Sequence, residues 1–163
     1  VMWDAFPSRV KPSPILPAVV KAGRLGTKNG KGFYSYENKQ GIAADDPNVE
    51  PLIRQYQGEQ KTYSPEQIAE RLILAMLLEG VRVLEDGIAR DPRDIDLGVI
   101  FGLGFPAFRG GLLYWADTVG LSTILQKLEP YADLGPRMQP PEMLVRMAKE
   151  GKRFYSVNRE RRS

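Results

Sequence analysis

The chain has 163 residues, of which 42% are hydrophobic, and a formal net charge of +3. This length fits one domain of ordinary size, or two small half-domains, with enough apolar residues for a packed core. The sequence contains no histidine and no cysteine, which excludes a histidine base, a cysteine nucleophile, a disulfide framework and any metal site built from these residues.

Hydropathy and charge indicate the compartment and the kind of partner to expect. No apolar run reaches the roughly 18 residues that a membrane helix needs, and the start lacks the order of a signal peptide. We expect no membrane span and a cytoplasmic protein, with an organelle matrix as the second possibility. The first 39 residues carry seven Lys or Arg against two acids. A solvated basic face explains this bias, and attraction to an anionic ligand or an acidic neighbouring domain is the alternative. Without a recognised motif, we expect no nucleic-acid partner.

The first third of the chain combines a short helix with a glycine-rich turn. Apolar residues at 16, 19 and 20, followed by Gly23, predict a helix of about two turns. The turn over 26–32 leads into aromatic residues 33–36, which we expect to anchor an extended segment on the core. Polar residues then dominate 37–63, which predicts a linker with one helical turn near 49–56.

The glycine-rich turn invites comparison with a phosphate-binding loop, because backbone N–H groups in such turns can hold phosphate. A P-loop needs four residues between its glycines and Ser or Thr after the lysine, whereas three residues separate Gly26 from Gly30 and glycine follows Lys31. We interpret the stretch as a structural turn. Neither it nor 102–104 completes the dinucleotide-binding fingerprint.

The clearest helix begins at Ser64, which can cap it, with Pro65 at the first position and Gln67 as capping-box partner. It is expected to run to about Asp86. A close helix contact is expected at Gly80. Six residues are expected to form its apolar face: Ile68, Leu72, Ala75, Met76, Val83 and Leu84.

Further helices are predicted from 91 to 102, with Asp91 as the cap, over 121–134, and from after Pro140-Pro141 to 149. Between the first two, a tight turn at 104–111 precedes a helix with inward-facing residues at 112, 113, 115, 116 and 119. No long strand pattern appears, so the expected class is all-α.

An internal repeat is suggested when the sequence is shifted by 128 residues. Lys21-Ala22-Gly23 then falls on Lys149-Glu150-Gly151, and both copies continue to an aromatic pair, Phe33-Tyr34 and Phe154-Tyr155. Duplication is one explanation and chance the other.

Two segments carry a resemblance to a known family. Residues 24–34 (RLGTKNGKGFY) and 101–117 (FGLGFPAFRGGLLYWAD) resemble the helical C-terminal region of 3-hydroxyacyl-CoA dehydrogenases, in the large multifunctional form (alpha subunit) used in fatty-acid β-oxidation. The similarity extends over about 12–155. It implies a helical bundle of the 6-phosphogluconate-dehydrogenase C-terminal-like type.

The resemblance also implies a domain organisation: 1–36 as the tail of a first helical repeat, 37–63 as a linker, 64–157 as a second repeat and 158–163 as a basic tail. In the family, an N-terminal dinucleotide-binding domain binds NAD and carries the catalytic residues. No catalytic, cofactor-binding or metal-binding residue is therefore expected in this chain.

The implied role is to form the wall of the acyl-CoA cleft and a pseudo-dimer interface within a parent that is an NAD-dependent 3-hydroxyacyl-CoA dehydrogenase, with enoyl-CoA hydratase activity expected too. Its partners would be acyl-CoA and the parent's remaining domains, and the chain alone would be inactive. A free-standing helical interaction module without enzymatic role is the alternative.

Five residues are candidates for contacts with substrate or with another domain: Phe105, Phe108, Arg109, Tyr114 and Trp115. The aromatics could line an acyl-chain path or simply belong to the core. Arg109 could bind a carboxylate or hydrogen-bond helix ends. Asp117 could hydrogen-bond a neighbouring turn. An exposed apolar patch around Gly80, Phe105 and Trp115 is expected, and with it self-association.

Overall fold

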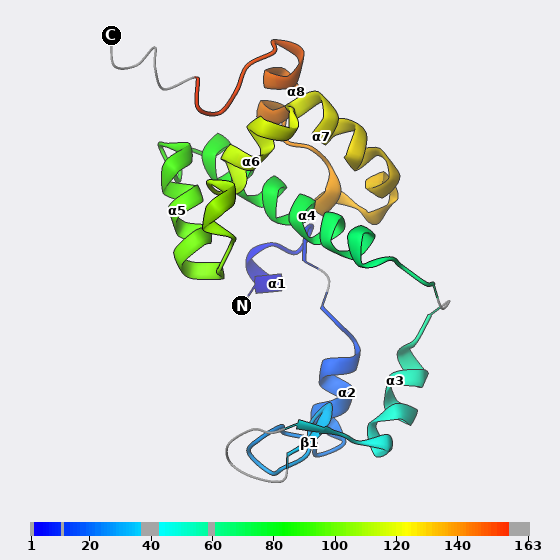
Figure 1. The fold of residues 1–163 in the computed structure, drawn as a ribbon. Coiled ribbons are helices and arrows are strands. Elements are labelled where there is room, and N and C mark those ends of the chain that lie inside the picture. The colour runs from blue at the N-terminus through cyan, green and yellow to red at the C-terminus, as the bar shows by residue number, and fades with distance from the viewer. Residues whose placement is uncertain (1, 11, 37–42, 59–60, 157–163) are drawn as a thin grey trace. The chain divides into compact units, whose positions relative to one another are not determined.

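The computed structural model describes residues 2–10, 12–36, 43–58 and 61–156 and is mainly helical (Figure 1). The predicted basic tail at 158–163 lies outside these residues. The chain divides into two compact units, an N-terminal unit of residues 1–62 and a C-terminal unit of residues 63–163.

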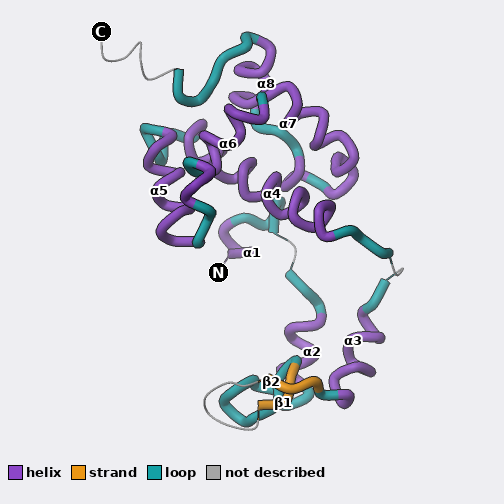
Figure 2. The backbone as a smooth tube through the Cα atoms, viewed as in Figure 1, coloured by secondary structure: helices purple, strands orange, loops and turns teal. Residues whose placement is uncertain are grey.

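The N-terminal unit combines three short helices with a two-stranded sheet. Its elements are α1 (Met2–Ala5), α2 (Ile15–Lys21), β1 (Tyr34–Tyr36), β2 (Ala43–Asp45), the 3-10 turn η1 (Pro47–Val49) and α3 (Glu50–Tyr56). Strands β1 and β2 pair antiparallel, with Ser35 opposite Ala44 (Figure 2). The helix expected before Gly23 is confirmed as α2. Val19 is its buried residue, whereas Leu16 and Val20 are exposed.

A buried arginine organises this unit. Arg24 donates from Nε to the carbonyl of Gly32 at 2.7 Å, and its guanidinium pairs with Asp46. Asp46 also accepts a hydrogen bond from the backbone N–H of Asn48, so it caps η1. Arg24 lies before the aromatic segment 33–36, and Asp46 lies in the segment 37–63 that was expected to be a linker. The ion pair therefore connects these two segments. The described part of the expected linker thus forms β2, η1 and α3 and packs with the rest of the unit.

The C-terminal unit is a helical bundle around one long helix (Figure 1). Its elements are α4 (Pro65–Glu85), α5 (Pro92–Leu103), η2 (Ala107–Arg109), α6 (Leu112–Val119), α7 (Leu121–Leu128), η3 (Glu129–Leu134), η4 (Pro136–Met138) and α8 (Glu142–Lys149). The helical class predicted from the sequence is confirmed. The short β1–β2 sheet is its one departure within the described residues.

The start of α4 is as predicted, but its buried face is not. The capping box of Ser64 and Gln67 is present. The predicted apolar face is wrong at Ile68 and Leu72, which are exposed, whereas its other four residues pack partly buried against the core: Ala75, Met76, Val83 and Leu84. Residues spaced by four advance about 400°, so a run at 68, 72 and 76 drifts about 40° per step around the helix. The buried face instead has the three-and-four spacing of Leu74, Leu77, Leu78 and Val81.

Gly80 lies where α4 meets α5 and α6, as the sequence suggested. A Cβ at this position would lie 3.3 Å from Cγ2 of Ile95 and 3.6 Å from Cδ2 of Leu112. The absence of a side chain therefore lets the helices approach closely. The core of the C-terminal unit comprises sixteen buried residues: Leu74, Leu77, Leu78, Val81, Ile95, Phe105, Leu112, Leu113, Ala116, Leu121, Ile124, Leu128, Met138, Leu144, Met147 and Phe154.

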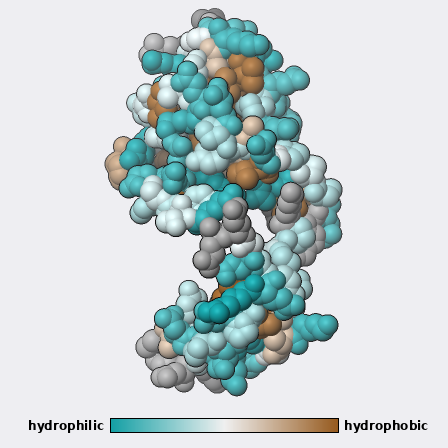
Figure 3. Space-filling view, turned by 90° about the vertical axis from the view of Figure 1, so that its right-hand side faces the viewer, coloured by the Kyte–Doolittle hydropathy of each residue, from teal (hydrophilic) through white to brown (hydrophobic). Residues whose placement is uncertain are grey.

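Burial of these residues leaves a mainly hydrophilic exterior on one side of the unit. The face drawn in Figure 3 carries hydrophilic side chains over most of its area, with small separate hydrophobic patches between them. The bundle thus has the usual arrangement of an apolar interior and a polar exterior on this face.

Two helix ends differ from the prediction. Helix α5 continues through Gly102 and stops at Gly104, which adopts a left-handed φ of 72°. The N–H groups of Gly104 and Phe105 both bond to the carbonyl of Val99, as in a glycine-terminated helix. The helix expected over 121–134 is α-helical only to Leu128 and then turns to 3-10 geometry. Pro130 explains this change, because it has no N–H to continue the α-helical pattern.

Candidate functional site

A carboxylate from α5 caps the start of α6. The residue before α6 is Gly111, which has no side chain to bind the free N–H groups of the first turn. Asp96 supplies the acceptors instead: Oδ1 accepts from the N–H of Leu113 at 2.7 Å and Oδ2 from that of Tyr114 at 3.0 Å. Asp96 is 2% exposed. A buried negative charge is thereby paired with the positive end of a helix.

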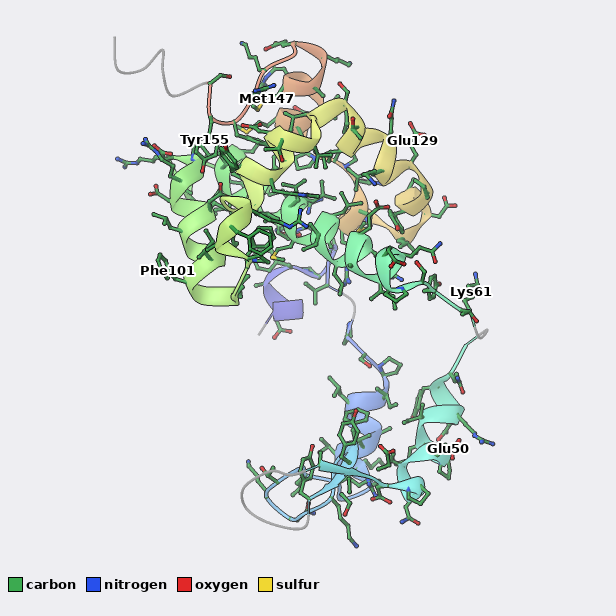
Figure 4. All side chains as sticks on the ribbon, in the orientation of Figure 1. Glu50, Lys61, Phe101, Glu129, Met147 and Tyr155 are labelled. Carbon is green, nitrogen blue, oxygen red and sulfur yellow. The ribbon has the colours of Figure 1, made fainter. Side chains whose placement is uncertain are left out.

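The same carboxylate holds the C-terminal segment. The hydroxyl of Tyr155 donates to Oδ2 of Asp96 at 2.6 Å, and its ring packs edge-on against Tyr114 with 5.4 Å between centroids. Asp117 on α6 accepts from the N–H groups of Phe154 at 2.9 Å and Tyr155 at 3.1 Å. We call Asp96, Asp117 and Tyr155 the carboxylate network. Figure 4 shows Tyr155 beside α5 and α6.

Burial raises the pKa of two groups in this network. It raises the pKa of the Tyr155 hydroxyl, which also donates to Asp96 and so favours the protonated phenol. Burial likewise raises the pKa of Asp117, although the N–H groups of Phe154 and Tyr155 oppose the rise. Each carboxylate oxygen of the network accepts a hydrogen bond from the protein itself. These groups therefore hold the start of α6 and the segment at 154–155 in place.

The turn before α6 requires its two glycines. Gly111 has φ of 113°, and a Cβ there would collide with the side chain of Asp96. A Cβ at Gly110, with φ of 78°, would lie 2.5 Å from the ring of Tyr114. A side chain at Gly111 would therefore displace Asp96, and one at Gly110 would displace the ring of Tyr114.

The five candidate residues do not converge on one site. Phe105 is buried in the core, and Trp115 packs against this core, half-buried. Phe108 and Arg109 are exposed on η2, with the Arg109 guanidinium 5.6 Å from the Phe108 ring centre. Tyr114 is nearly half-exposed beside Tyr155. Two of the five therefore belong to the core or pack on it, and the other three lie at the surface of the unit.

The predicted exposed patch around Gly80, Phe105 and Trp115 is wrong, since Gly80 and Phe105 are buried. A different apolar surface is exposed. Phe101 is 84% exposed and Phe108 85% exposed, with Leu97 and Leu103 also largely exposed. We call these four residues the α5 surface. Figure 4 shows Phe101 pointing away from the bundle. Three of the four lie on α5, so this one helix exposes three large apolar side chains.

The described ranges hold no group of three or more potential ligands for a metal ion. No helix among them is both long and apolar enough to cross a bilayer.

Comparison with known proteins decides the family. Residues 68–156 match the family model described as 3-hydroxyacyl-CoA dehydrogenase, C-terminal domain. The chain belongs to this family. The resemblance inferred from the sequence is thereby confirmed, and the matched residues include the whole carboxylate network.

Curated relatives extend the match over nearly the full chain. It is 40% identical over 161 residues to the fatty acid oxidation complex subunit alpha of Ectopseudomonas oleovorans, covering 96% of this chain and 22% of the relative. The same protein of Pseudomonas putida GB-1 matches equally. The chain thus spans about a fifth of the length of these relatives. The fold resembles the dehydrogenase part of multifunctional enzyme 1 from C. elegans, with a TM-score of 0.61, 24% identity, and coverage of 83% of this chain and 33% of that one.

Only part of the carboxylate network could be predicted from the sequence. The expectation that Asp117 bonds a neighbouring turn is confirmed. Asp96 stands out in the sequence only as an acid near the central helices. The signal that could have revealed its role is the pair Gly110-Gly111 directly before a helix without Ser, Thr, Asn or Asp as cap, since such a start needs a carboxylate from elsewhere.

Proposed function

We propose that this chain is the helical scaffold of a larger NAD-dependent 3-hydroxyacyl-CoA dehydrogenase of fatty-acid β-oxidation, where it forms a wall of the acyl-CoA cleft and a pseudo-dimer interface. The observation that carries this proposal is the α5 surface. A unit with a complete core of its own nevertheless exposes two phenylalanines and two leucines on α5 and η2. Such a surface is typical of one that another domain covers.

The chain's own residues do not fit a nicotinamide dinucleotide. That cofactor needs a glycine-rich turn between a parallel strand and a helix. The strands described in this chain are three residues long and antiparallel, and α3 comes after them only through η1. In this proposal NAD is bound elsewhere in the parent, and the scaffold carries no catalytic group. The parent is also expected to have enoyl-CoA hydratase activity in a further region.

The first experiment is an assay of NAD reduction with a 3-hydroxyacyl-CoA. We expect the isolated 163-residue chain to be folded, by circular dichroism, and to show no turnover above a no-enzyme control. We expect the parent to be active. Turnover that co-purifies with the chain through several columns would contradict the scaffold role.

The second experiment tests the interface directly. Phe101→Glu in this chain should weaken its binding to the remaining domains of the parent by about tenfold or more, since a large aromatic within an interface contributes about 1–2 kcal/mol. Ser122→Glu, an exposed residue on α7, is the matched control. The measurement is binding of the chain to the separately expressed remainder, with dehydrogenase activity followed in parallel.

The isolated chain should also self-associate through the same surface. Sedimentation at increasing concentration should show a dimer that Phe101→Glu weakens and Ser122→Glu does not. Leu112 is unsuitable for this purpose because it is fully buried, and a charge there would disrupt the core. A free-standing interaction module would use the same surface but would not bind the dehydrogenase remainder, and that binding result separates the two functions.

A further inference from the structure

A pocket lies in the C-terminal unit between the end of α4, the turn after it, and α8. Its volume is about 480 Å³, which falls within the usual span of small-molecule sites. It shares no residue with the α5 surface. We call it the α4–α8 pocket.

The floor of the α4–α8 pocket is apolar. Phe154 and Met147 line it and are nearly completely buried, and Pro92 is buried beside them. Leu84 and Met143 lie on its walls. Methionine side chains are flexible and polarisable, so they adapt to apolar ligands of varied shape. Figure 4 shows Met147 on α8.

The rim of the pocket is charged, with cations in excess. It carries three basic and two acidic residues, which leaves a net charge of +1: Arg90, Arg146 and Lys152 against Glu85 and Glu150. Both acids already have partners. Glu150 forms an ion pair with Lys152 at 2.9 Å, and Glu85 accepts the N–H of Met143 at 2.6 Å.

The two arginines are differently placed. Neither Arg90 nor Arg146 forms an ion pair with a residue in the described ranges, and both are exposed at the mouth. Arg146 is close enough to Glu150 to lower the pKa of that carboxyl, after the larger effect of Lys152. The positive charge at the rim that no acid neutralises is therefore about one.

We propose that the α4–α8 pocket binds an amphipathic monoanion, with an apolar body on Met147 and Phe154 and a single carboxylate at Arg90 and Arg146. A guanidinium fork matches the geometry of a carboxylate, and a net rim charge of +1 suits one negative charge better than two. The volume far exceeds that of a bare ion, since one water occupies about 30 Å³. The proposal is independent of the dehydrogenase function, because the site lies within this chain and its test measures no turnover.

The test is a titration of the full chain with octanoate, kept below its micelle concentration and followed by NMR of labelled methionine methyl groups. Met143 and Met147 should shift and saturate, whereas Met138, which lies in η4 outside the pocket, should not. Octanol keeps the tail without the charge and acetate keeps the charge without the tail. Each should bind at least about tenfold more weakly than octanoate, because each loses one of the two sets of contacts.

The charge requirement is tested with Arg90→Gln combined with Arg146→Gln, which should weaken octanoate binding at least about tenfold through loss of the charged hydrogen bonds. Lys149→Gln is the matched control on the same helix and outside this pocket. Circular dichroism and the Met138 signal verify folding of each variant. The proposal is overturned by an absence of saturable shifts at Met143 and Met147 in the unaltered chain, by equal affinity for octanol, or by unchanged affinity in a folded double variant.

Discussion

The ends of α2 and α8 adopt the same backbone turn although they lie in different units. Each stops at a left-handed glycine, Gly23 with φ of 73° and Gly151 with φ of 62°. The N–H of the next residue bonds five residues back in both: Arg24 to Val19 at 3.0 Å and Lys152 to Met147 at 2.9 Å. These pairs are related by the same 128-residue shift that aligns the two parts of the sequence.

The segments after the two turns differ completely. In the C-terminal unit, the aromatic pair Phe154-Tyr155 is held by two buried carboxylates and closes on a core of sixteen residues. In the N-terminal unit, the pair Phe33-Tyr34 leads into a small hairpin stabilised by Arg24 and Asp46, and only Val19 and Val49 are buried apolar residues among those described. The left-handed glycine thus ends the helix in both units, whereas the conformation of the segment that follows depends on the tertiary contacts available to it. Duplication remains a prediction that this likeness supports.

The largest expected effect is the loss of stability when a side chain is added at Gly111, next to Asp96. Gly111→Ala should destabilise the C-terminal unit by about 4 kcal/mol, since it combines backbone strain with a collision against Asp96. Gly104→Ala is the control: it shares a positive φ but has open space around it, so about 1 kcal/mol is expected. Urea denaturation measures both. Equal losses would show that Asp96 moves aside at little cost.

The next effect concerns the carboxylate that faces this glycine. Asp96→Ala leaves the N–H groups of Leu113 and Tyr114 and the hydroxyl of Tyr155 without their acceptor. We expect a loss of about 3 kcal/mol in the free energy of unfolding. Asp94→Ala, on the exposed side of the same helix, should cost less than about 1 kcal/mol. A similar loss for both variants would contradict the special role of Asp96.

Asp46 in the N-terminal unit and Asp117 in the C-terminal unit should contribute to the pH dependence of stability with opposite signs. Hydrogen bonding to Arg24 and Asn48 lowers the pKa of Asp46 from 3.8 to about 2. The unfolded chain then binds more protons, so this contribution is present above pH 3.8 and is lost as pH falls toward about 2. Burial raises the pKa of Asp117, so the folded state binds more protons there and stability is lost as pH rises through the raised value.

Amide hydrogen exchange, read separately in each unit, measures this difference. Asp46→Asn should remove the acid-side loss of protection in the N-terminal unit. Asp117→Asn should remove a pH dependence of opposite slope in the C-terminal unit. If both substitutions changed the pH dependence of protection in the same direction, the surroundings of the two carboxylates would not differ as the structure indicates.

Local signals explain how much of this fold could be predicted from the sequence. Caps and stops at Ser64, Asp91 and Gly23 depend on neighbouring residues, and their predictions are confirmed. The buried face of α4 and the pairing of Arg24 with Asp46 could not be predicted, because both depend on which distant element packs there. The capping of α6 by Asp96 is hidden for the same reason, since 17 residues separate Asp96 from Leu113. Of the carboxylate network, the sequence therefore pointed to Asp117 but not to its partners Asp96 and Tyr155.

The smallest expected effect concerns the start of α4, which has a side-chain cap where the starts of α2 and α8 have none. Helices α2 and α8 begin behind Pro14 and Pro141 without a side-chain cap. Helix α4 begins with both arms of a capping box: Oγ of Ser64 accepts from the N–H of Gln67 at 3.2 Å, and the N–H of Ser64 donates to the Gln67 side chain at 2.9 Å. Ser64→Ala should therefore cost about 1 kcal/mol.

Ser122→Ala provides the control for this last effect, because Ser122 is exposed within α7 and caps no helix. The midpoint of urea denaturation should fall for Ser64→Ala and stay within error for Ser122→Ala. Gln67→Ala should produce a smaller loss than Ser64→Ala, since it removes only the returning arm of the box. An unchanged midpoint for Ser64→Ala would mean that the packing of Leu74, Leu77 and Leu78 alone determines where α4 begins, so that its cap contributes as little as the uncapped starts of α2 and α8.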